Sequence, residues 1–137
     1  MRNRFLAALV LIATAAQAVP PMPPELARTT WRWVSLTTPE ETVTIAESER
    51  YTLRFSDGDR IALRADCNRA AGSVVFPEPG AIRFGALAIT RAMCPPGSLG
   101  DRFAREVGRA VRWAVHGGEL RLELPADAGV LHFTRQP

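Results

Sequence analysis

The chain lacks lysine altogether, and its 17 basic residues are all arginines. These arginines form no dense run, because acidic residues are interspersed among them along the chain. A surface that follows a nucleic-acid backbone needs clustered cations, so we expect no nucleic-acid partner. The bias towards arginine names no reaction, although the planar guanidinium suits ion pairs that contact both oxygens of a carboxylate.

No apolar run is long enough to cross a bilayer, which takes roughly 20 residues. Residues 5–14 are apolar, follow Arg2 and Arg4, and precede the small residues of Ala16-Gln17-Ala18. A basic start, a short apolar run and small residues at the cleavage positions predict a signal peptide over residues 1–18. An uncleaved membrane anchor is the alternative. No cysteine directly follows the run to carry a lipid, so we expect a soluble periplasmic protein without a stable membrane span after cleavage.

The sequence Pro-Pro-Met-Pro-Pro occupies positions 20–24, just after the predicted cleavage site. Because proline fixes φ, residues 19–28 are expected to form an extended, semi-rigid linker, with a ligand for a proline-binding domain as the alternative. Residues 29–137 suit one domain with a modest core. Loss of the two arginines of the signal peptide lowers the formal charge of +3 by two, to +1, so the high pI overstates the basic character.

Alternating apolar residues predict several short strands. The most regular pair is residues 51–55 and 61–65, which flank Asp57-Gly58, a dipeptide suited to a tight hairpin turn. The other predicted strands lie at Trp31, Trp33 and Ser35, at residues 72–76 and 81–84 on either side of a Pro-Gly turn, and at residues 120–124 and 131–133 in a terminal hairpin.

One helix interrupts the predicted strands. Ser98 is the expected N-cap, and Gly117 is expected just beyond the C-terminus. Apolar residues recur at three- and four-residue steps through residues 99–114, which predicts an amphipathic helix of about 18 residues with one buried face. The expected fold class is mainly β (α+β): a compact antiparallel β-barrel-like sheet with one amphipathic helix packed on it.

Cys67 and Cys94 are the two cysteines of the chain. In an oxidising compartment an even number of cysteines favours a disulfide, which would add roughly 3.5 kcal/mol of stability by closing the loop between them. A catalytic redox pair usually has two intervening residues at a helix N-terminus, so the long spacing disfavours that alternative. Two thiols are too few for a structural zinc site, and neither His116 nor His132 has metal-site spacing, so we expect no metal or cofactor.

The sequence shows no catalytic constellation. Residues 97–100 read Gly-Ser-Leu-Gly and lack the Gly-x-Ser-x-Gly frame of a hydrolase nucleophile. His116, at the predicted end of the helix, and His132, on a strand, fit structural roles. The acidic residues at 40–41 and 47–49 fall in a solvated loop, where nothing predicts the burial that a general acid needs. We therefore expect a protein that is not an enzyme.

The three tryptophans have two interpretations. Trp31 and Trp33 face one side of a strand, and Trp113 ends the predicted helix beside its apolar face. Aromatic side chains line the cavity of small barrels that hold one apolar ligand, but more often they fill the core. A domain of this size has little spare volume, so we favour core packing and keep a ligand cavity as the alternative.

Both cysteines lie within motifs that occur in a defined order with other elements of the chain. The order is a Trp-containing strand at 31–36, Tyr-x-Leu-x-Phe at 51–55, Cys-Asn-Arg-x-x-Gly at 67–72, Leu-Ala-x-Thr-x-x-x-Cys at 87–94, a helix, and Leu-x-Leu…Leu-x-Phe at 120–133. This order resembles the META domain, or HslJ-like heat-shock protein, family over nearly the whole chain after the signal. Asp66 replaces the glycine that many members have before the first cysteine. If that position requires a positive φ, aspartate is among the residues that tolerate it.

The resemblance implies a barrel-like antiparallel sheet with one packed helix. Members are bacterial envelope proteins, often lipoproteins, linked to heat shock, antibiotic tolerance or secretion, and no biochemical activity is established for them. We therefore expect an exported, non-enzymatic, monomeric envelope protein that is linked to stress or antibiotic tolerance and binds an unidentified protein or small apolar ligand. A β-barrel inhibitor or chaperone-like module acting on an envelope enzyme is the alternative, and an enzyme of unrecognised type is a third.

A disulfide would bring the residues beside the two cysteines within a few ångströms of one another. Asn68, Arg69, Thr90 and Arg91 then form either a hydrogen-bonded structural corner or a recognition patch for an envelope partner. We favour the structural corner, because asparagine commonly completes turns through its side chain.

The disulfide can be tested directly by thiol labelling. When the protein is unfolded without a reductant after removal of the signal peptide, a thiol reagent should modify neither Cys67 nor Cys94. Reduction before labelling should make both reactive, as measured by the increase in mass. Two labelled cysteines in the unreduced sample would contradict the covalent link.

Overall fold

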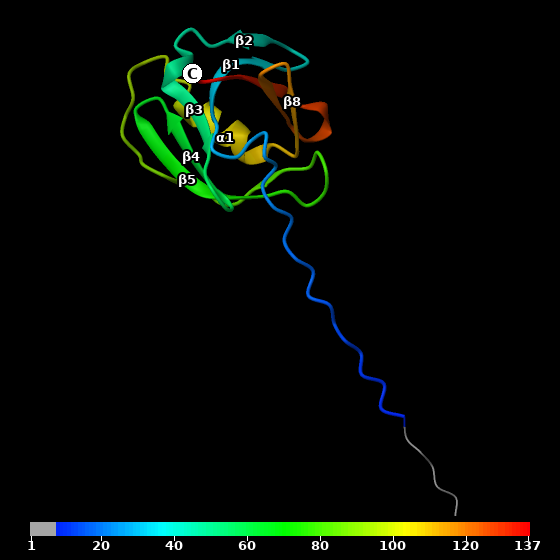
Figure 1. The fold of residues 1–137 in the computed structure, drawn as a ribbon. Helices are drawn as coiled ribbons and strands as arrows, with labels where there is room; N and C mark the ends of the chain where they lie inside the picture. Colours follow the sequence, from blue (N-terminus) through cyan, green and yellow to red (C-terminus); the bar gives the residue numbers. More distant parts are fainter. Residues whose placement is uncertain (1–7) are drawn as a thin grey trace, which may run out of the picture.

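The computed structural model describes residues 8–137. From Thr30 onward, antiparallel strands bend into a nearly closed barrel, and one helix packs on it (Figure 1), which confirms the predicted fold class. Residues 8–18 run away from the barrel as an extended trace. In this described part of the chain, no helix is both long and apolar enough to span a membrane. Arg2, Arg4 and the first residues of the predicted apolar run lie outside the described residues.

Ten strands belong to one sheet in the described residues. The elements are β1 (Thr30–Thr37), β2 (Thr42–Thr44), β3 (Tyr51–Phe55), β4 (Arg60–Ala65), β5 (Asn68–Val75), β6 (Arg83–Phe84), β7 (Ala88–Ile89), α1 (Gly100–Arg109), β8 (Arg112–His116), β9 (Glu119–Glu123) and β10 (Val130–Arg135), with short 3-10 helices at Ser48–Arg50 and Pro125–Asp127. The strand order is β6-β5-β4-β3-β1-β10-β9-β8, while β2 pairs with β1 and β7 with β5. The three predicted hairpins are therefore present, and the pairing of β1 with β10 joins the two ends of the domain.

A short seam closes the barrel between its two outer strands. Ala81 and Arg112 form an isolated antiparallel bridge. Beside it, the N–H of Trp113 in β8 donates to the carbonyl of Gly80 at 3.0 Å. Gly80 has a φ of +79°, a conformation that glycine adopts without strain. The seam thus pairs part of an edge that an open sheet would leave exposed.

Strand β1 lies between β3 and β10, in the middle of the sheet. Trp31 and Trp33 point into the core and are fully buried. A β-bulge between Trp33 and Ser35 in the pairing with β10 then shifts the alternation by one residue. As a result Leu36 is buried and Ser35 is only half-buried, so the prediction of Ser35 as the third inward-facing residue is wrong.

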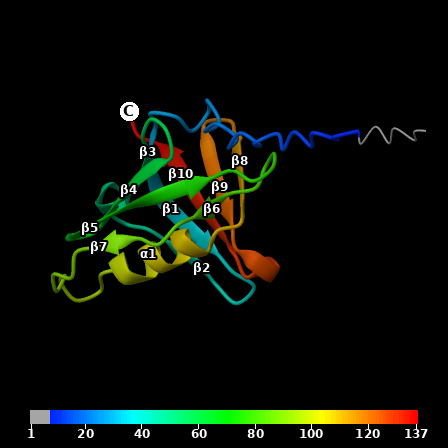
Figure 2. The same ribbon diagram turned by 90° about the horizontal axis from the view of Figure 1, so that it is seen from below.

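Helix α1 packs across one end of the barrel (Figure 2) and inserts Phe103 into the core. The ring of Phe103 stacks on Trp33, with centroids 5.0 Å apart and an interplanar angle of 18°. It also meets Tyr51 edge to face at 5.9 Å and lies 6.2 Å from Phe133. Trp31 and Trp33 are thus part of one buried cluster that includes the helix and the sheet.

The predicted helix of about 18 residues is wrong in its second half. Helix α1 has 10 residues, and at its end Ala110 is extended, with φ −59° and ψ 141°. The segment that follows is strand β8, which pairs with β9. Val111, predicted on the buried face of the helix, is 40% exposed.

Two residues that were assigned to the end of this helix therefore lie on a strand. Trp113 faces Leu122 in the pairing of β8 with β9, and it meets Phe76 edge to face at 6.1 Å. His116 is the last residue of β8. The apolar residues of this segment fit both a helical period and strand alternation, and pairing with β9 decides between them.

The packed part of the chain begins before the predicted domain boundary at residue 29. Leu26 is fully buried in the core, and Met22 packs against it from the surface. The N–H groups of Leu26 and Ala27 both donate to the carbonyl of Pro23, at 3.0 and 3.1 Å. The end of the proline-rich segment is therefore a turn that places the side chain of Leu26 in the core of the barrel.

Removing the Phe103 ring, which packs helix α1 against the sheet, should strongly destabilise the protein. We expect Phe103→Ala to lower the free energy of unfolding by about 3–5 kcal/mol, because it leaves a cavity among aromatic rings. Urea denaturation measures the loss. Val111→Ala, at an exposed position, is the control and should change stability by about 0.5 kcal/mol or less. A loss for Phe103→Ala as small as the control's would contradict the described packing.

Candidate functional site at the disulfide

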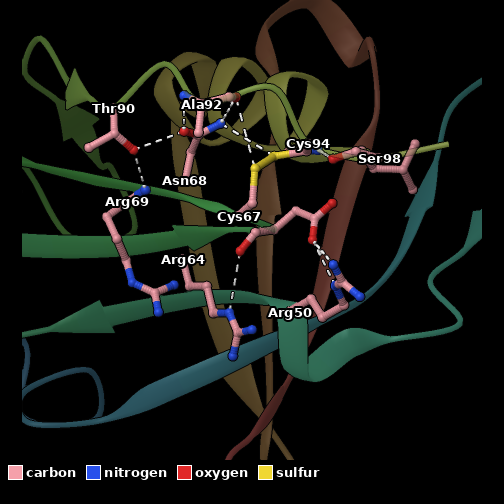
Figure 3. The surroundings of a disulfide bond; sticks show 12 residues. Arg50, Arg64, Cys67, Asn68, Arg69, Thr90, Ala92, Cys94 and Ser98 are labelled. Atoms are coloured by element: carbon pink, nitrogen blue, oxygen red, sulfur yellow. Dashed lines mark hydrogen bonds and ion pairs between the residues drawn. A yellow bond between two sulfur atoms is a disulfide. The ribbon is translucent and has the colours of Figure 1, made fainter. Parts of the chain in front are cut away.

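Cys67 and Cys94 form a disulfide, as predicted, with Cα atoms 5.5 Å apart and a sequence separation of 27 residues (Figure 3). Cys67 lies in the tight turn between β4 and β5, and Cys94 lies in the loop that runs from β7 to α1. The bond therefore ties a hairpin of the sheet to the segment that leads into the helix.

Asn68, the first residue of β5, is only 5% exposed and uses both ends of its side-chain amide. Its Oδ1 accepts hydrogen bonds from the N–H of Ala92 at 2.8 Å and the hydroxyl of Thr90 at 2.9 Å. Its Nδ2 donates to the carbonyl of Ala92 at 3.0 Å and lies 3.4 Å from the sulfur of Cys94. The amide thus pairs with Ala92 in both directions, much as a neighbouring strand would (Figure 3). Both ends of this buried amide are therefore satisfied within the fold, as buried polar groups usually are.

Thr90 completes the same corner. Its Oγ1 accepts the N–H of Arg69 at 3.0 Å, and its own N–H donates to the carbonyl of Arg69 at 2.9 Å. The side chain of Arg69 points away from the loop, to the same side of the sheet as Arg64 (Figure 3). Arg91 is exposed. The structure therefore brings the four predicted patch residues to one corner, where two are committed to internal bonds and two carry exposed guanidinium groups.

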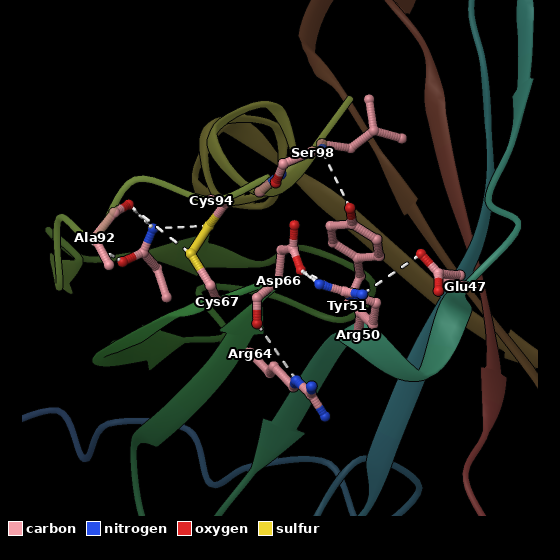
Figure 4. A network of polar contacts seen from close by, with 12 residues as sticks. Glu47, Arg50, Tyr51, Arg64, Asp66, Cys67, Ala92, Cys94 and Ser98 are labelled. Carbon is pink, nitrogen blue, oxygen red and sulfur yellow. Dashed lines mark hydrogen bonds and ion pairs between the residues drawn. A yellow bond between two sulfur atoms is a disulfide. The ribbon is translucent and has the colours of Figure 1, made fainter. Parts of the chain in front are cut away.

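Asp66, directly before the disulfide, has a φ of +60°. Aspartate is among the few residues other than glycine that tolerate this conformation, so the positive φ that the sequence allowed for at this position is present. Its carboxylate is 4% exposed and accepts a hydrogen bond of 2.7 Å from Nε of Arg50 (Figure 4). The hydrogen bond from Ser98, together with the hydrogen bond and charge of Arg50, holds the pKa of Asp66 below its usual value, although burial acts to raise it.

The start of helix α1 is anchored to the sheet beside this carboxylate. The N–H of Leu99 donates to the Tyr51 hydroxyl at 3.0 Å, and the N–H of Gly100 donates to Oγ of Ser98 at 3.2 Å. Leu99 is the N-cap, so the prediction that placed the cap at Ser98 is wrong by one residue. A Cβ on Gly100 would come within 2.6 Å of the carbonyl of Ala65, which explains the glycine at this close approach.

The loop between β7 and α1, residues 90–99, carries an unusual side chain at its tip. Met93 is 98% exposed, whereas the other exposed large apolar side chain within residues 24–137 is Val111 at 40%. Beside Met93, the loop and Asn68 line a surface pocket of about 280 Å³ that includes Cys94 and Ser98. Because the disulfide and the amide of Asn68 hold the base of the loop, the methionine is presented from a fixed support.

The two histidines do not join this corner. Nε2 of His132, on β10, lies 3.5 Å from the hydroxyl of Thr37. Burial, together with the positive charge of Arg121, lowers the pKa of His132, so its ring is neutral near neutral pH. His116 is exposed at the end of β8. Within residues 8–137, no cluster of three or more His, Cys, Asp or Glu residues is placed to hold a metal ion.

These features define a class of small, single-helix β-barrels in which a disulfide ties a sheet hairpin to the approach of the helix. The chain belongs to the META domain family, whose sequence model matches residues 24–137. The match includes both cysteine motifs and confirms the resemblance seen in the sequence. Among curated proteins, none matches the chain.

Several solved structures share this fold. A protein from Burkholderia xenovorans, solved by NMR, has a TM-score of 0.67 and 21% identity, and the match covers 94% of this chain and 99% of that one. A DUF4847 family protein from Bacteroides vulgatus has a TM-score of 0.58 and 10% identity, with 82% of this chain and 96% of that one covered. Another NMR structure gives a TM-score of 0.62 at 21% identity over 82% of this chain and 93% of its own. At these identities the likeness shows the fold alone.

Replacing Asp66 should weaken the corner in a pH-dependent way. Asp66→Asn keeps a residue that tolerates positive φ but loses the charge-assisted bonds, so we expect it to lower stability by about 1–3 kcal/mol near neutral pH. Because the folded pKa is depressed, the carboxylate contributes fully above its unfolded pKa of about 4, and its contribution is lost as the pH falls through the folded pKa.

Urea denaturation from neutral to strongly acidic pH measures this dependence. The difference between wild type and Asp66→Asn should shrink as the solution becomes acidic. Asp59→Asn, at an exposed position, is the control for a general loss of negative charge. A difference that stays constant down to the lowest pH would refute the role assigned to Asp66.

Proposed function

We propose that the protein is exported to the bacterial envelope and acts there by binding another protein, without catalysis. One observation carries the proposal: the loop at residues 90–99 is fixed at its base, yet its tip exposes Met93 almost completely. Methionine adapts to irregular apolar surfaces and is common at binding sites. A loop that is already ordered also loses little conformational entropy when it binds.

Export is supported by two features of the chain. The signal-peptide pattern at residues 1–18 has the expected order of basic, apolar and small residues. The disulfide is of the kind that persists in oxidising compartments. The association of META-domain proteins with heat shock and antibiotic tolerance supports a role in envelope stress.

The polar side chains of the corner and the core aromatic rings are already engaged within the fold, which favours a protein partner over a small ligand. Asn68 and Thr90 are engaged in bonds within the corner, and Asp66 is paired with Arg50, so these groups support the fold. Trp33 packs on Phe103 in the core, which disfavours a small apolar ligand held inside the barrel. An inhibitor of an envelope enzyme, the alternative function, would use the same exposed loop.

Substitutions at the loop separate recognition from structure. We expect Met93→Ser combined with Arg91→Gln to leave the melting temperature unchanged and to abolish the contribution of the gene to survival under heat or antibiotic stress. Asn68→Ala, by contrast, should lower the melting temperature, because it leaves buried groups of the loop unpaired. Full survival with the double variant would refute recognition through the loop.

Site-specific crosslinking identifies the partner. A photo-crosslinking residue at position 93 should give a discrete adduct in stressed cells, and excess unmodified protein should compete it away. The same residue at position 111, which is also exposed, is the matched control and should give none. The absence of an adduct from position 93 would count against the proposed function.

A further inference from the structure

The strands on one side of the barrel contain arginines and no acidic residues. β1, β3, β4 and β5 include neither Asp nor Glu. Four arginines on these strands form what we call the arginine face: Arg32, Arg54, Arg64 and Arg69. A fifth, Arg60, stands at the start of β4. This grouping is not visible in the sequence, because acidic residues in the turns separate the arginines along the chain.

The strand register places three of these side chains in one row. Arg32 pairs with Thr52, Thr52 pairs with Arg64, and Arg64 pairs with Arg69. Directly paired residues point to the same side of a sheet, so the row crosses four strands. Their sequence neighbours, such as Leu63, are buried, which puts the row on the outer surface. Figure 3 shows Arg64 and Arg69 side by side on the face away from the disulfide loop.

Arg54 belongs to the adjacent row. It pairs with Thr30 on one side and with Ala62 on the other, and Ala62 pairs with Ala71. The outward-facing residues among the four arginines are therefore threonine and alanine, which have short side chains. Arg54 and Arg69 are exposed on this surface, whereas Arg32 and Arg64 are half-buried.

The arginine face has contacts of its own within the described residues. Nε of Arg64 donates to the carbonyl of Asp66 at 3.4 Å, and its charge helps to lower the pKa of the Asp66 carboxyl. Arg54 donates to the hydroxyl of Thr30 at 3.1 Å. None of these contacts is an ion pair.

Other arginines of the described residues form ion pairs, such as Arg28 with Asp57 at 2.7 Å and Arg102 with Glu41 at 2.6 Å. No ion pair of residues 8–137 includes a member of the arginine face. Like charges directly opposite each other in a sheet are destabilising, as for Arg64 and Arg69, so the fold carries this arrangement at a cost.

We propose that the arginine face docks the protein on an anionic membrane surface, with the guanidinium groups contacting lipid phosphates. Arginine suits this ligand, because its planar fork can bind phosphate through two parallel hydrogen bonds. Cations near an anionic leaflet are attracted by its surface potential, and a planar array lets several act at once.

The composition of the face disfavours two other partners. Single-stranded nucleic acids are held by aromatic side chains on which bases stack, and the outward positions among these arginines are threonine and alanine. Protein interfaces usually need a buried apolar or aromatic anchor, which the same positions lack. Arg69 pairs with Thr90 at the edge of the face, so docking would leave the Met93 loop at the rim of the contact.

Vesicle binding tests the proposal. The full chain is mixed with vesicles of phosphatidylglycerol and phosphatidylcholine, or of phosphatidylcholine alone, and the bound fraction is measured by sedimentation. Residues 5–14 can themselves enter a bilayer, and they are the same in every variant. The measured quantity is therefore the ratio of binding to anionic and to neutral vesicles, which is compared between variants. We expect each neutralised arginine to lower this preference about five-fold and added salt to weaken it.

The decisive comparison uses charge-matched variants. Arg64→Gln with Arg69→Gln should lower the preference by about twenty- to thirty-fold, as should Arg54→Gln with Arg69→Gln if the first pair disturbs folding. Arg112→Gln with Arg121→Gln removes the same charge from β8 and β9 and should have little effect. Equal losses in test and control variants would overturn the proposal. So would the absence of an anionic preference in the wild type, or a face-dependent affinity for a DNA oligonucleotide without one for vesicles.

Discussion

The insertion of Phe103 between the two halves of the sheet is the contact on which the rest of the structure depends. A small barrel has to fill its interior with side chains. Here one ring from the helix stacks on Trp33 of the central strand and also contacts Tyr51 and Phe133, from strands on either side of β1. The sheet therefore bends around a residue that lies outside it. The helix in turn keeps its place because the barrel surrounds its buried face.

The position of the helix explains the disulfide corner. Once α1 is seated, residues 90–99 have to cross from β7 to its first turn, and the turn at Asp66 lies beside their path. The amide of Asn68, the disulfide and the Tyr51 hydroxyl fix this crossing at three points. The polar residues beside the two cysteines thus hold the loop in place, and what the loop leaves outside is an apolar tip.

Local patterns predict those parts of the fold that a single strand or turn determines. Strict alternation located β3 and β4, and the cysteine motifs located the corner. The predicted end of the helix was wrong because the segment around Trp113 fits both a helical period and strand alternation. Only its pairing with β9 selects the strand. Strands β2 and β7, with three and two residues, are too short to show a period. The arginine face was missed because it depends on register among four strands, which no run of sequence contains.

The seam at Ala81 and Arg112 determines where the folded barrel can open in part. Closure by a single isolated bridge means that the two outermost strands are held together by few backbone bonds. Thermal opening there would release two strand edges at once while the aromatic cluster stayed intact. Such edges pair readily with those of another molecule, so exchange of strands between copies would start at the seam.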